Sequence, residues 1–388
     1  MIQSLFDTDI YKFSMSYAAM VKYPLAEARF AFTDRAKVSR SPEFLSRFIE
    51  EMKKAQDITF SQEQFDWACK TIPYIPEFYW EWLRGFRFDY NKMDIYLDDE
   101  GILHVEVLDK WYRSTLYEIL VLFTVTEVQN QLNGNIEKYD ETEMLRRLSK
   151  KVELSNENVL KFSEFGTRRR FSSDVQDTVC KYLKENSKYC VGTSNVHFAH
   201  KYGMRPCGTQ AHEWFMAHEV YGFLQTNYLA LEAWSSVFDG DLGIALTDTS
   251  SVNSFIMNFS MKLAKLFDGV RCDSGDEYEF TEKMIKRYQE LGINPLSKTI
   301  IYSNALDFEK ALNIQKHFEG RIQTSFGIGT NLTNDTGFRA ENIVMKMKQF
   351  RMTPRENFIN TIKISDDAGK HMGPEEEIRF AKHVLGIK

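Results

Sequence analysis

The chain of 388 residues lacks the features that would place it at a membrane or outside the cell. Its longest apolar run, residues 119–123, lies between Glu118 and Glu127 and is far shorter than the roughly 20 residues of a membrane-spanning helix. The first ten residues contain Asp7 and Asp9 but no basic segment followed by an apolar core, so we expect no export signal. We therefore predict a cytoplasmic protein that does not act at a membrane.

Cysteines are few, and neither sign of charge is in large excess. The five cysteines show no CxxC spacing and are odd in number, which is typical of a reducing compartment. Lys and Arg total 49 against 55 for Asp and Glu, a net charge of −6 that argues against nucleic acid as the main partner. An anionic ligand would therefore have to be held by a few local groups.

The N-terminal part mixes helix and strand signals. Alternation over residues 28–32 predicts a strand, the aromatic-rich stretch 78–86 predicts a helix, and residues 95–97 and 103–107 flank a turn that contains Gly101. We predict an α+β domain over residues 1–135, which the C-terminal segment 340–388 completes. The charge-rich segment 134–158 is predicted to be a solvated helix and linker.

After residue 162 the pattern changes to short apolar runs that end in small polar residues, each followed by a helical pattern. Alternation of strands and helices predicts a parallel sheet. We expect an α/β fold with an irregular, closed or nearly closed (β/α) barrel over residues 136–339, in preference to an open doubly wound sheet. Both architectures place active sites at the carboxyl ends of the strands. The predicted strand ends lie at 165–167, 191–194, 207–209, 246–248, 273–275, 302–304 and 326–330.

Glycines, threonines and serines recur at these strand ends. Gly327 and Gly329 precede Thr330, and glycines of this kind let unpaired amides and a hydroxyl approach phosphate oxygens. A single Gly-x-Gly is also common wherever a strand meets a tight turn. Repetition around one edge of the sheet favours phosphate binding.

Three consecutive arginines, Arg168, Arg169 and Arg170, follow one strand end directly. In an extended backbone Arg168 and Arg170 share a side, so at least one arginine should face the barrel mouth. Most such triplets are solvated basic patches. Their position after a Gly-Thr strand end favours binding of a carboxylate or phosphate, which a guanidinium contacts through two parallel hydrogen bonds.

His212 lies in the first turn of a helix that is predicted to run towards Trp234. His218 follows six positions later, which is not the spacing of an HExxH zinc site, and no His-x-His is present. Arg271 and Asp273 lie together at another strand end. Asp273 could bind Mg²⁺, contact ribose hydroxyls or orient an imidazole, whereas helix capping would account for Asp276 and could account for Asp248.

Taken together, these motifs resemble the nicotinate phosphoribosyltransferase family of type II phosphoribosyltransferases. The resemblance covers essentially the whole chain, and the six motifs occur in the family's order. They are residues 7–12 (DTDIYK), 165–170 (FGTRRR), 191–195 (VGTSN), 208–214 (GTQAHEW), 271–276 (RCDSGD) and 325–330 (SFGIGT).

The resemblance implies transfer of phosphoribosyl from phosphoribosyl pyrophosphate to nicotinate with Mg²⁺, for NAD biosynthesis. It further implies coupling to ATP hydrolysis through a phosphorylated histidine, which would be His212, and a homodimer with sites near the subunit interface. Catalytic roles are carried over to Arg168, which would bind the nicotinate carboxylate, and to Asp273. The substrate-binding candidates are Tyr11, Thr209, Arg271, Arg169, Ser194, Ser303, Gly327, Gly329 and Thr330.

The resemblance also suggests how these groups are arranged. Tyr11 would stack on the pyridine ring, reaching in from the partner subunit. Asp248 or Asp273 would hold the proton of the His212 imidazole, because the neighbouring Glu213 points about 100° away on a helix. Gly327, Gly329 and Thr330 would hold the ribose 5-phosphate.

The chain departs from the family pattern at two places. Asn304 and Ala305 follow Tyr302-Ser303 where many relatives have Asp, and the segment 365–370 lacks the proline that often precedes its Gly-Lys. Two alternatives remain open. One is a nicotinamide or quinolinate phosphoribosyltransferase, and the other is a regulator that binds phosphoribosyl pyrophosphate without catalysis.

Overall fold

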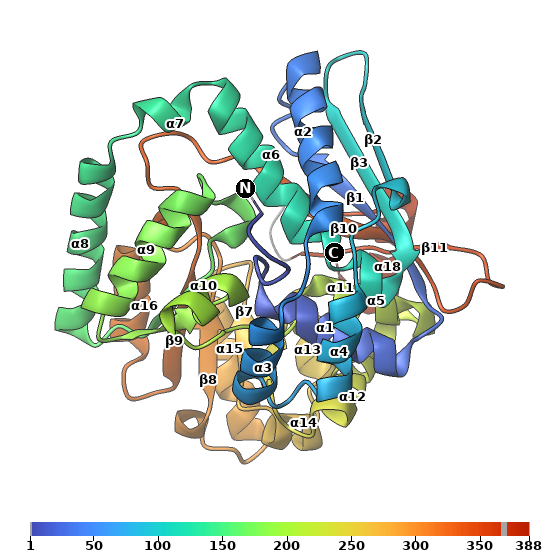
Figure 1. Ribbon diagram of the computed structural model, residues 1–388. Helices are drawn as coiled ribbons and strands as arrows, with labels where there is room; N and C mark the ends of the chain where they lie inside the picture. Colours follow the sequence, from blue (N-terminus) through green and yellow to red (C-terminus); the bar gives the residue numbers. More distant parts are fainter. Residues whose placement is uncertain (1, 366–370, 388) are drawn as a thin grey trace.

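The computed structural model describes residues 2–365 and 371–387 of the chain, which form two β-sheets and the helices around them (Figure 1). One sheet has five strands in the order β11-β10-β1-β3-β2, and the other has six strands in the order β5-β4-β9-β8-β7-β6. Residues 366–370, which include most of the departure at 365–370, lie outside the described part.

The five-stranded sheet joins the two ends of the chain. Its strands are β1 (Glu27–Asp34), β2 (Met93–Leu97), β3 (Leu103–Lys110), β10 (Ile343–Arg351) and β11 (Ile359–Asn360). All its pairs are antiparallel, and the predicted hairpin is confirmed, with Leu97 opposite Leu103 and a positive φ at Gly101. Because β10 pairs along the whole of β1, residues 343–351 belong with the N-terminal strands. The predicted domain boundaries at 135, 136 and 339–340 stay a prediction.

The six-stranded sheet is parallel throughout. Its strands are β4 (Phe162–Glu164), β5 (Cys190–Thr193), β6 (Ile244–Leu246), β7 (Gly269–Cys272), β8 (Thr299–Tyr302) and β9 (Gln323–Ile328). The first strand, β4, pairs with the last, β9, so the order is that of a barrel in which only the β5–β6 pair is missing. The predicted α/β class with an additional α+β unit is therefore confirmed, and in the described residues the ring of strands stays open at one place.

The open place is occupied by the segment for which a seventh strand was predicted. Instead of a strand ending at 207–209, the chain forms a single parallel bridge between Pro206 and Thr193 of β5. On the other side, the side chains of Thr209 and Gln210 donate hydrogen bonds to the Ile244 carbonyl of β6, at 3.1 Å each. These two side-chain hydrogen bonds replace part of the main-chain hydrogen bonding that a seventh strand would have made with β6. Six of the seven predicted strands are present, and the prediction of a strand ending at 207–209 was wrong.

Helices cover the outside of the parallel strands. They are α8 (Glu141–Asn158), α9 (Ser173–Asn186), α10 (Val196–Tyr202), α13 (Val252–Asn258), α14 (Met261–Leu266), α15 (Glu277–Glu290) and α16 (Phe308–Phe318). The predicted charge-rich helix is present as α8, which buries only the stripe formed by Met144, Leu148, Val152 and Ser155. Helices α13 and α14 are separate, and α14 begins after Ser260, whose hydroxyl accepts from the Leu263 amide.

The helix that begins at His212 is shorter than predicted. It is α11 (His212–His218), and two 3-10 turns over 219–225 separate it from α12 (Thr226–Phe238). Gly222 lies between these turns with φ +96°, a conformation that glycine adopts without strain and that cannot continue a helix. His212 therefore lies on a helix of seven residues, not on one that runs to Trp234.

Helix α6 (Tyr117–Leu132) connects the two sheets and is buried on nearly all sides. It packs against α2 (Pro42–Lys54), β10 and the 3-10 turn Thr167–Arg169, and α2 lies beside it in Figure 1. Its two buried carboxylates, Glu118 and Glu127, form ion pairs with neighbouring elements. No helix in the described part of the chain is long and apolar enough to cross a membrane.

A glycine in β5 tests the packing at the open place. A Cβ atom at Gly192 would lie 2.0 Å from the Arg205 carbonyl oxygen, which belongs to the bridging segment and cannot move without breaking it. We predict that Gly192→Ala lowers the free energy of unfolding by about 1–3 kcal/mol, the usual range for overpacking. Urea unfolding of this variant measures the change.

Gly85 provides the matched control, because a Cβ there meets nothing within 4 Å and the residue ends the helix α4 (Glu77–Gly85). Gly85→Ala should leave the stability unchanged or raise it slightly. Equal stability of the two variants would contradict the close contact.

Candidate active site

The predicted site residues lie around the carboxyl edge of the parallel sheet. The register sets the end of β4 beside that of β9, the Phe165 amide donating to the Ile328 carbonyl at 2.8 Å. It likewise sets the end of β7 beside those of β6 and β8. Polar groups as far apart in the chain as Arg168 and Thr330 thus meet at one edge, and α11 brings His212 to the place where the ring is open.

His212 is held by a carboxylate at the end of β6. Its Nε2 lies 2.9 Å from Asp248 Oδ1 and 3.7 Å from Asp273 Oδ2. The other oxygen of Asp248 accepts from Ser274 Oγ at 2.7 Å and pairs with Lys363 Nζ at 3.2 Å. Of the two carboxylates that sequence reasoning left open, Asp248 is the one within hydrogen-bonding distance.

The His212 imidazole is neutral at physiological pH. Burial, assisted by the positive charge of Lys363, lowers its pKa to about 4, although Asp248 and Asp273 act in the opposite direction. A neutral ring that faces a carboxylate through Nε2 carries its proton on that nitrogen, which leaves the lone pair on Nδ1. Because no described residue hydrogen-bonds Nδ1, this nitrogen can act as a nucleophile.

Arg271, Asp273 and Ser303 form a second cluster beside this pair. Arg271 donates to Asp273 Oδ1 and to Ser303 Oγ, both at 2.8 Å. The guanidinium keeps the pKa of Asp273 far below its ordinary value despite burial, so the carboxylate is ionised. Oδ1 of Asp273 is thus saturated, whereas Oδ2 faces His212.

The three arginines have three different environments. They lie on the 3-10 turn Thr167–Arg169 and the residue after it, so the expectation that Arg168 and Arg170 share one side was wrong. Arg168 keeps 35% of its side chain exposed, with Glu118 Oε1 3.9 Å away. Arg170 is fully buried and forms ion pairs with Asp7 and Glu127. Arg168 is therefore the group that can meet a ligand, with the partly exposed Arg169 beside it.

Tyr11 lies in the first turn of α1 (Ile10–Lys22), among the charges of its own chain. Burial raises the pKa of its hydroxyl, whereas the nearby Arg168 and Arg271 act in the opposite direction. Tyr11 is thus near Arg168 of its own chain, and the expectation that it reaches in from the partner subunit stays a prediction.

The remaining predicted residues lie at the same edge but are engaged in structural contacts. Ser194 is buried and donates to Asp9 Oδ1 at 2.6 Å, and Thr209 spans the open place of the sheet. Gly327 lies inside β9, where a Cβ would meet the Phe165 ring at 2.3 Å. Gly329 and Thr330 are partly exposed at the start of the short helix α17 (Thr330–Thr333) and are the more accessible part of this motif.

Sequence reasoning missed the lysines of the site. Lys363 contacts Asp248, and Lys346 of β10 lies 3.9 Å from Glu118, with a pKa that burial lowers to about 8. Lys12 is fully buried between Glu118 and Glu213, the residue next to His212. Lys12 lies inside the motif 7–12 but was not assigned to the site, whereas Lys346 and Lys363 are far in sequence from every motif, and no spacing signals them.

His212, Asp248 and Asp273 are also the three residues whose ligand atoms lie within 4.8 Å of one another, as in a metal site. Lys363 and Arg271 already neutralise the two carboxylates, and the imidazole proton points at Asp248. A resident metal ion held by all three groups does not fit this arrangement. The free Oδ2 of Asp273 can supply one oxygen ligand to a cation that arrives with a substrate.

Comparison with known proteins agrees with these motifs. The model of the nicotinate phosphoribosyltransferase (NAPRTase) family matches residues 160–387, and that of its N-terminal domain matches residues 6–126. A nicotinate phosphoribosyltransferase of Chromohalobacter salexigens is 41% identical over 390 residues, covering 100% of this chain and 99% of its own. One from Methanosarcina mazei is 36% identical over 413 residues, with the same coverage.

Two crystal structures extend the similarity to the fold. The nicotinate phosphoribosyltransferase of Porphyromonas gingivalis superposes with a TM-score of 0.98 at 41% identity and 100% coverage of both chains. That of Vibrio cholerae gives 0.93 at 33% identity, covering 100% of this chain and 95% of its own. On the family models, the full-length relatives and the shared fold, the chain belongs to the nicotinate phosphoribosyltransferase family.

Proposed function

We propose that this chain transfers phosphoribosyl from 5-phosphoribosyl 1-pyrophosphate to nicotinate, as a step of NAD biosynthesis, and couples the transfer to ATP hydrolysis. The observation that supports it best is the neutral His212, oriented by Asp248, beside the arginines and small polar residues at the sheet edge. Arg168 favours an acid over an amide as the pyridine substrate, because a guanidinium binds a carboxylate through two charge-assisted hydrogen bonds.

In the proposed transfer, the pyridine nitrogen attacks C1 of the ribose as the bond from C1 to the pyrophosphate oxygen breaks. The pyrophosphate leaves with the bonding electrons, and the nitrogen needs no general base because its lone pair is free. Arg168 and Tyr11 position nicotinate, while Gly329 and Thr330 hold the 5-phosphate. Fixed charges and positioning therefore do most of the catalysis.

Mg²⁺ would accompany the pyrophosphate and spread its negative charge. Asp273 would hold the ion through Oδ2, together with oxygens of the substrate and water, as Mg²⁺ commonly binds. Its other oxygen stays with Arg271, which keeps the carboxylate ionised and oriented.

In the coupling step, Nδ1 of His212 attacks the γ-phosphorus of ATP and ADP leaves with the bridging oxygen. The proton on Nε2 stays between the ring and Asp248, which stabilises the positive charge that the imidazole gains. Water later cleaves the phosphorus–nitrogen bond and restores the neutral ring. A coupling of this kind changes substrate affinity only by the difference in free energy between the two states.

The homodimer and the cytoplasmic location stay predictions. All five cysteines are free, which suits a reducing compartment. Light scattering on the eluting protein would give the number of subunits. A product assay with nicotinate, nicotinamide and quinolinate, each with and without ATP, separates the proposal from its alternatives.

The first prediction concerns His212. His212→Ala should abolish nicotinate-dependent ATP hydrolysis and acid-labile phosphate on the protein, because no other described nitrogen occupies the same place. Transfer without ATP should continue at a low rate. His104→Ala is the control, since this histidine lies on β3 and stacks on Tyr96, away from the site. Unchanged coupling in His212→Ala would refute the mechanism.

The second prediction concerns proton affinity. The measurement is a pH titration of the histidine NMR resonances, in which the resonance of His212 is the one missing from His212→Ala. Because the pKa of His212 is lowered to about 4, this ring should stay unprotonated down to about pH 5. Lys363→Gln removes a positive charge that opposes protonation, so the titration of His212 should move to higher pH. The control is Lys348→Gln, which removes an exposed lysine paired with Glu106. A midpoint near 6.5 in the unsubstituted protein would contradict the assignment.

The third prediction concerns the carboxylate of the substrate. Arg168→Gln keeps one amide donor and loses one of the two charge-assisted hydrogen bonds, worth about 1.5–3 kcal/mol, so the KM for nicotinate should rise about ten- to hundredfold. The KM for nicotinamide should change little. Arg321→Gln, in an exposed pair with Glu282, serves as the control. An equal rise of both KM values would place the carboxylate elsewhere.

A further inference from the structure

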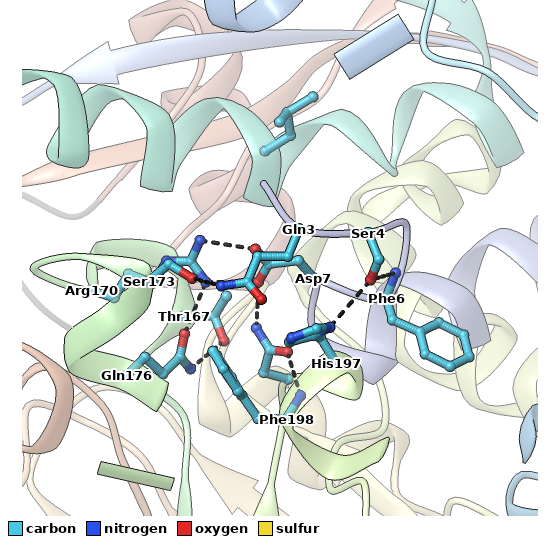
Figure 2. Close-up of polar contacts among 12 residues, drawn as sticks. Gln3, Ser4, Phe6, Asp7, Thr167, Arg170, Ser173, Gln176, His197 and Phe198 are labelled. Atoms are coloured by element: carbon cyan, nitrogen blue, oxygen red, sulfur yellow. Dashed lines mark hydrogen bonds and ion pairs between the residues drawn. The ribbon is translucent and has the colours of Figure 1, made fainter. Parts of the chain in front are cut away.

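The third arginine of the triplet is the centre of a buried polar network (Figure 2). Arg170 Nη1 and Nη2 donate to the two oxygens of Asp7, at 2.7 and 2.9 Å. Its Nε donates to Glu127 at 2.8 Å, Nη1 also donates to Gln176 at 3.2 Å, and the guanidinium lies 4.1 Å from the centre of the Phe123 ring. Arg170 is thus saturated and unable to bind substrate.

Asp7 belongs to a segment of turns and bends, residues 4–9, that is attached to the chain at the end of β5. The Ile10 amide donates to the Ser194 carbonyl, and the amides of Val196 and His197 donate to the carbonyls of Thr8 and Phe6, all within 2.9 Å. Asp7 Oδ1 also accepts from Asn195 Nδ2 at 2.9 Å. The segment therefore bridges two strand ends, with β5 bound through the backbone and the turn after β4 bound through the Asp7–Arg170 pair.

This segment leads directly into the first turn of α1. Tyr11 follows Asp7 by four residues, and Arg168 precedes Arg170 by two. The Asp7–Arg170 pair is therefore one of the contacts that hold the segment before Tyr11 against the turn that carries Arg168. Asp9, two residues before Tyr11, is held in turn by the Ser194 hydroxyl at 2.6 Å.

We infer that Asp7 and Arg170 are positioning residues for the pyridine substrate: their ion pair fixes the segment that carries Tyr11 against the turn that carries Arg168. The group that stacks on the ring and the group that binds the carboxylate are thereby set at a fixed separation before nicotinate binds. The inference rests on the proposed function, because it assigns those two roles to Tyr11 and Arg168.

A second buried ion pair, between Arg40 and Asp34, has no candidate site residue among its partners and serves as a comparison. Arg40 is equally buried, pairs with Asp34 at 2.8 Å and with Glu341, hydrogen-bonds Gln129 and lies over the Phe44 ring. Both arginines thus have one aspartate, one glutamate, one glutamine and one phenylalanine as partners. The hydrogen-bonding and ion-pair partners of Arg40 include none of the candidate site residues, so the two pairs differ mainly in what they position.

The test compares Asp7→Asn with Asp34→Asn in the full-length enzyme. Both variants should melt at a lower temperature than the unsubstituted protein, since each removes a carboxylate charge that compensates a buried guanidinium. Asp7→Asn alone should raise the KM for nicotinate about tenfold, while kcat at saturating nicotinate and the KM for phosphoribosyl pyrophosphate stay within about twofold. Hydrogen exchange should accelerate in peptides covering residues 6–12 and 165–171.

Each outcome decides the inference. Equal KM changes in the two variants, or a loss of kcat with no change in the KM for nicotinate, would overturn it. So would faster exchange at both peptides with an unchanged KM. If Asp7→Asn does not fold, Arg170→Lys retains the buried charge but loses the two parallel hydrogen bonds, and the same KM shift is expected. If the unsubstituted enzyme does not use nicotinate, the proposed function fails, and hydrogen exchange alone still tests whether the pair fixes the two segments.

Discussion

Pairing of buried charge along α6 is the constraint on which the arrangement of the two sheets depends. A charge removed from water is tolerated only with a partner, and breaking one such pair leaves the other charge uncompensated. Glu118 faces Lys12 of α1 and Lys346 of β10, while Glu127 faces Arg170 after β4. One helix thus joins the N-terminal helix, the antiparallel sheet and an end of the parallel sheet through contacts that cannot be lost singly.

The same network of buried ion pairs extends to the residue next to His212. Lys12 also binds Glu213, whose other oxygen accepts from the Trp111 indole at 3.2 Å. Glu213 is therefore a structural residue that fixes the first turn of α11, and its neighbour His212 faces Asp248. Glu213 and His212 thus have different partners, as expected for adjacent residues, which point in different directions on a helix. This difference explains why a carboxylate next to the histidine in sequence has no part in orienting it.

Much of the fold could be predicted because it depends on local pattern. Alternation predicts β1 and the β2–β3 hairpin, and small polar residues after apolar runs predict the ends of six parallel strands. Parallel topology alone then brings Arg168, Ser194, Asp248, Arg271, Ser303 and Thr330 to one edge. The rest depends on contacts that are distant in sequence. Lys363 approaches Asp248 across 115 residues, and nothing in its surroundings distinguishes it from a solvated lysine.

The side-chain directions of the three consecutive arginines also could not be predicted from the sequence. An extended backbone would have put Arg168 and Arg170 together, but the tight turn after β4 sends one to the mouth and one into the interior. Which of them stays accessible follows from Asp7 and Glu127, acids that lie 163 and 43 residues away. Composition could indicate an anion site, but it could not decide which cation serves it.

The gap between β5 and β6 has a mechanical consequence for the protein. Elsewhere in the parallel sheet, shifting a strand end would break main-chain hydrogen bonds on both of its flanks. The stretch that leads into His212 is anchored to β6 by only two side-chain hydrogen bonds to a single carbonyl. Of the described edge, this seam is the least costly to deform, so the stretch that leads into His212 can shift without breaking a ladder of main-chain hydrogen bonds.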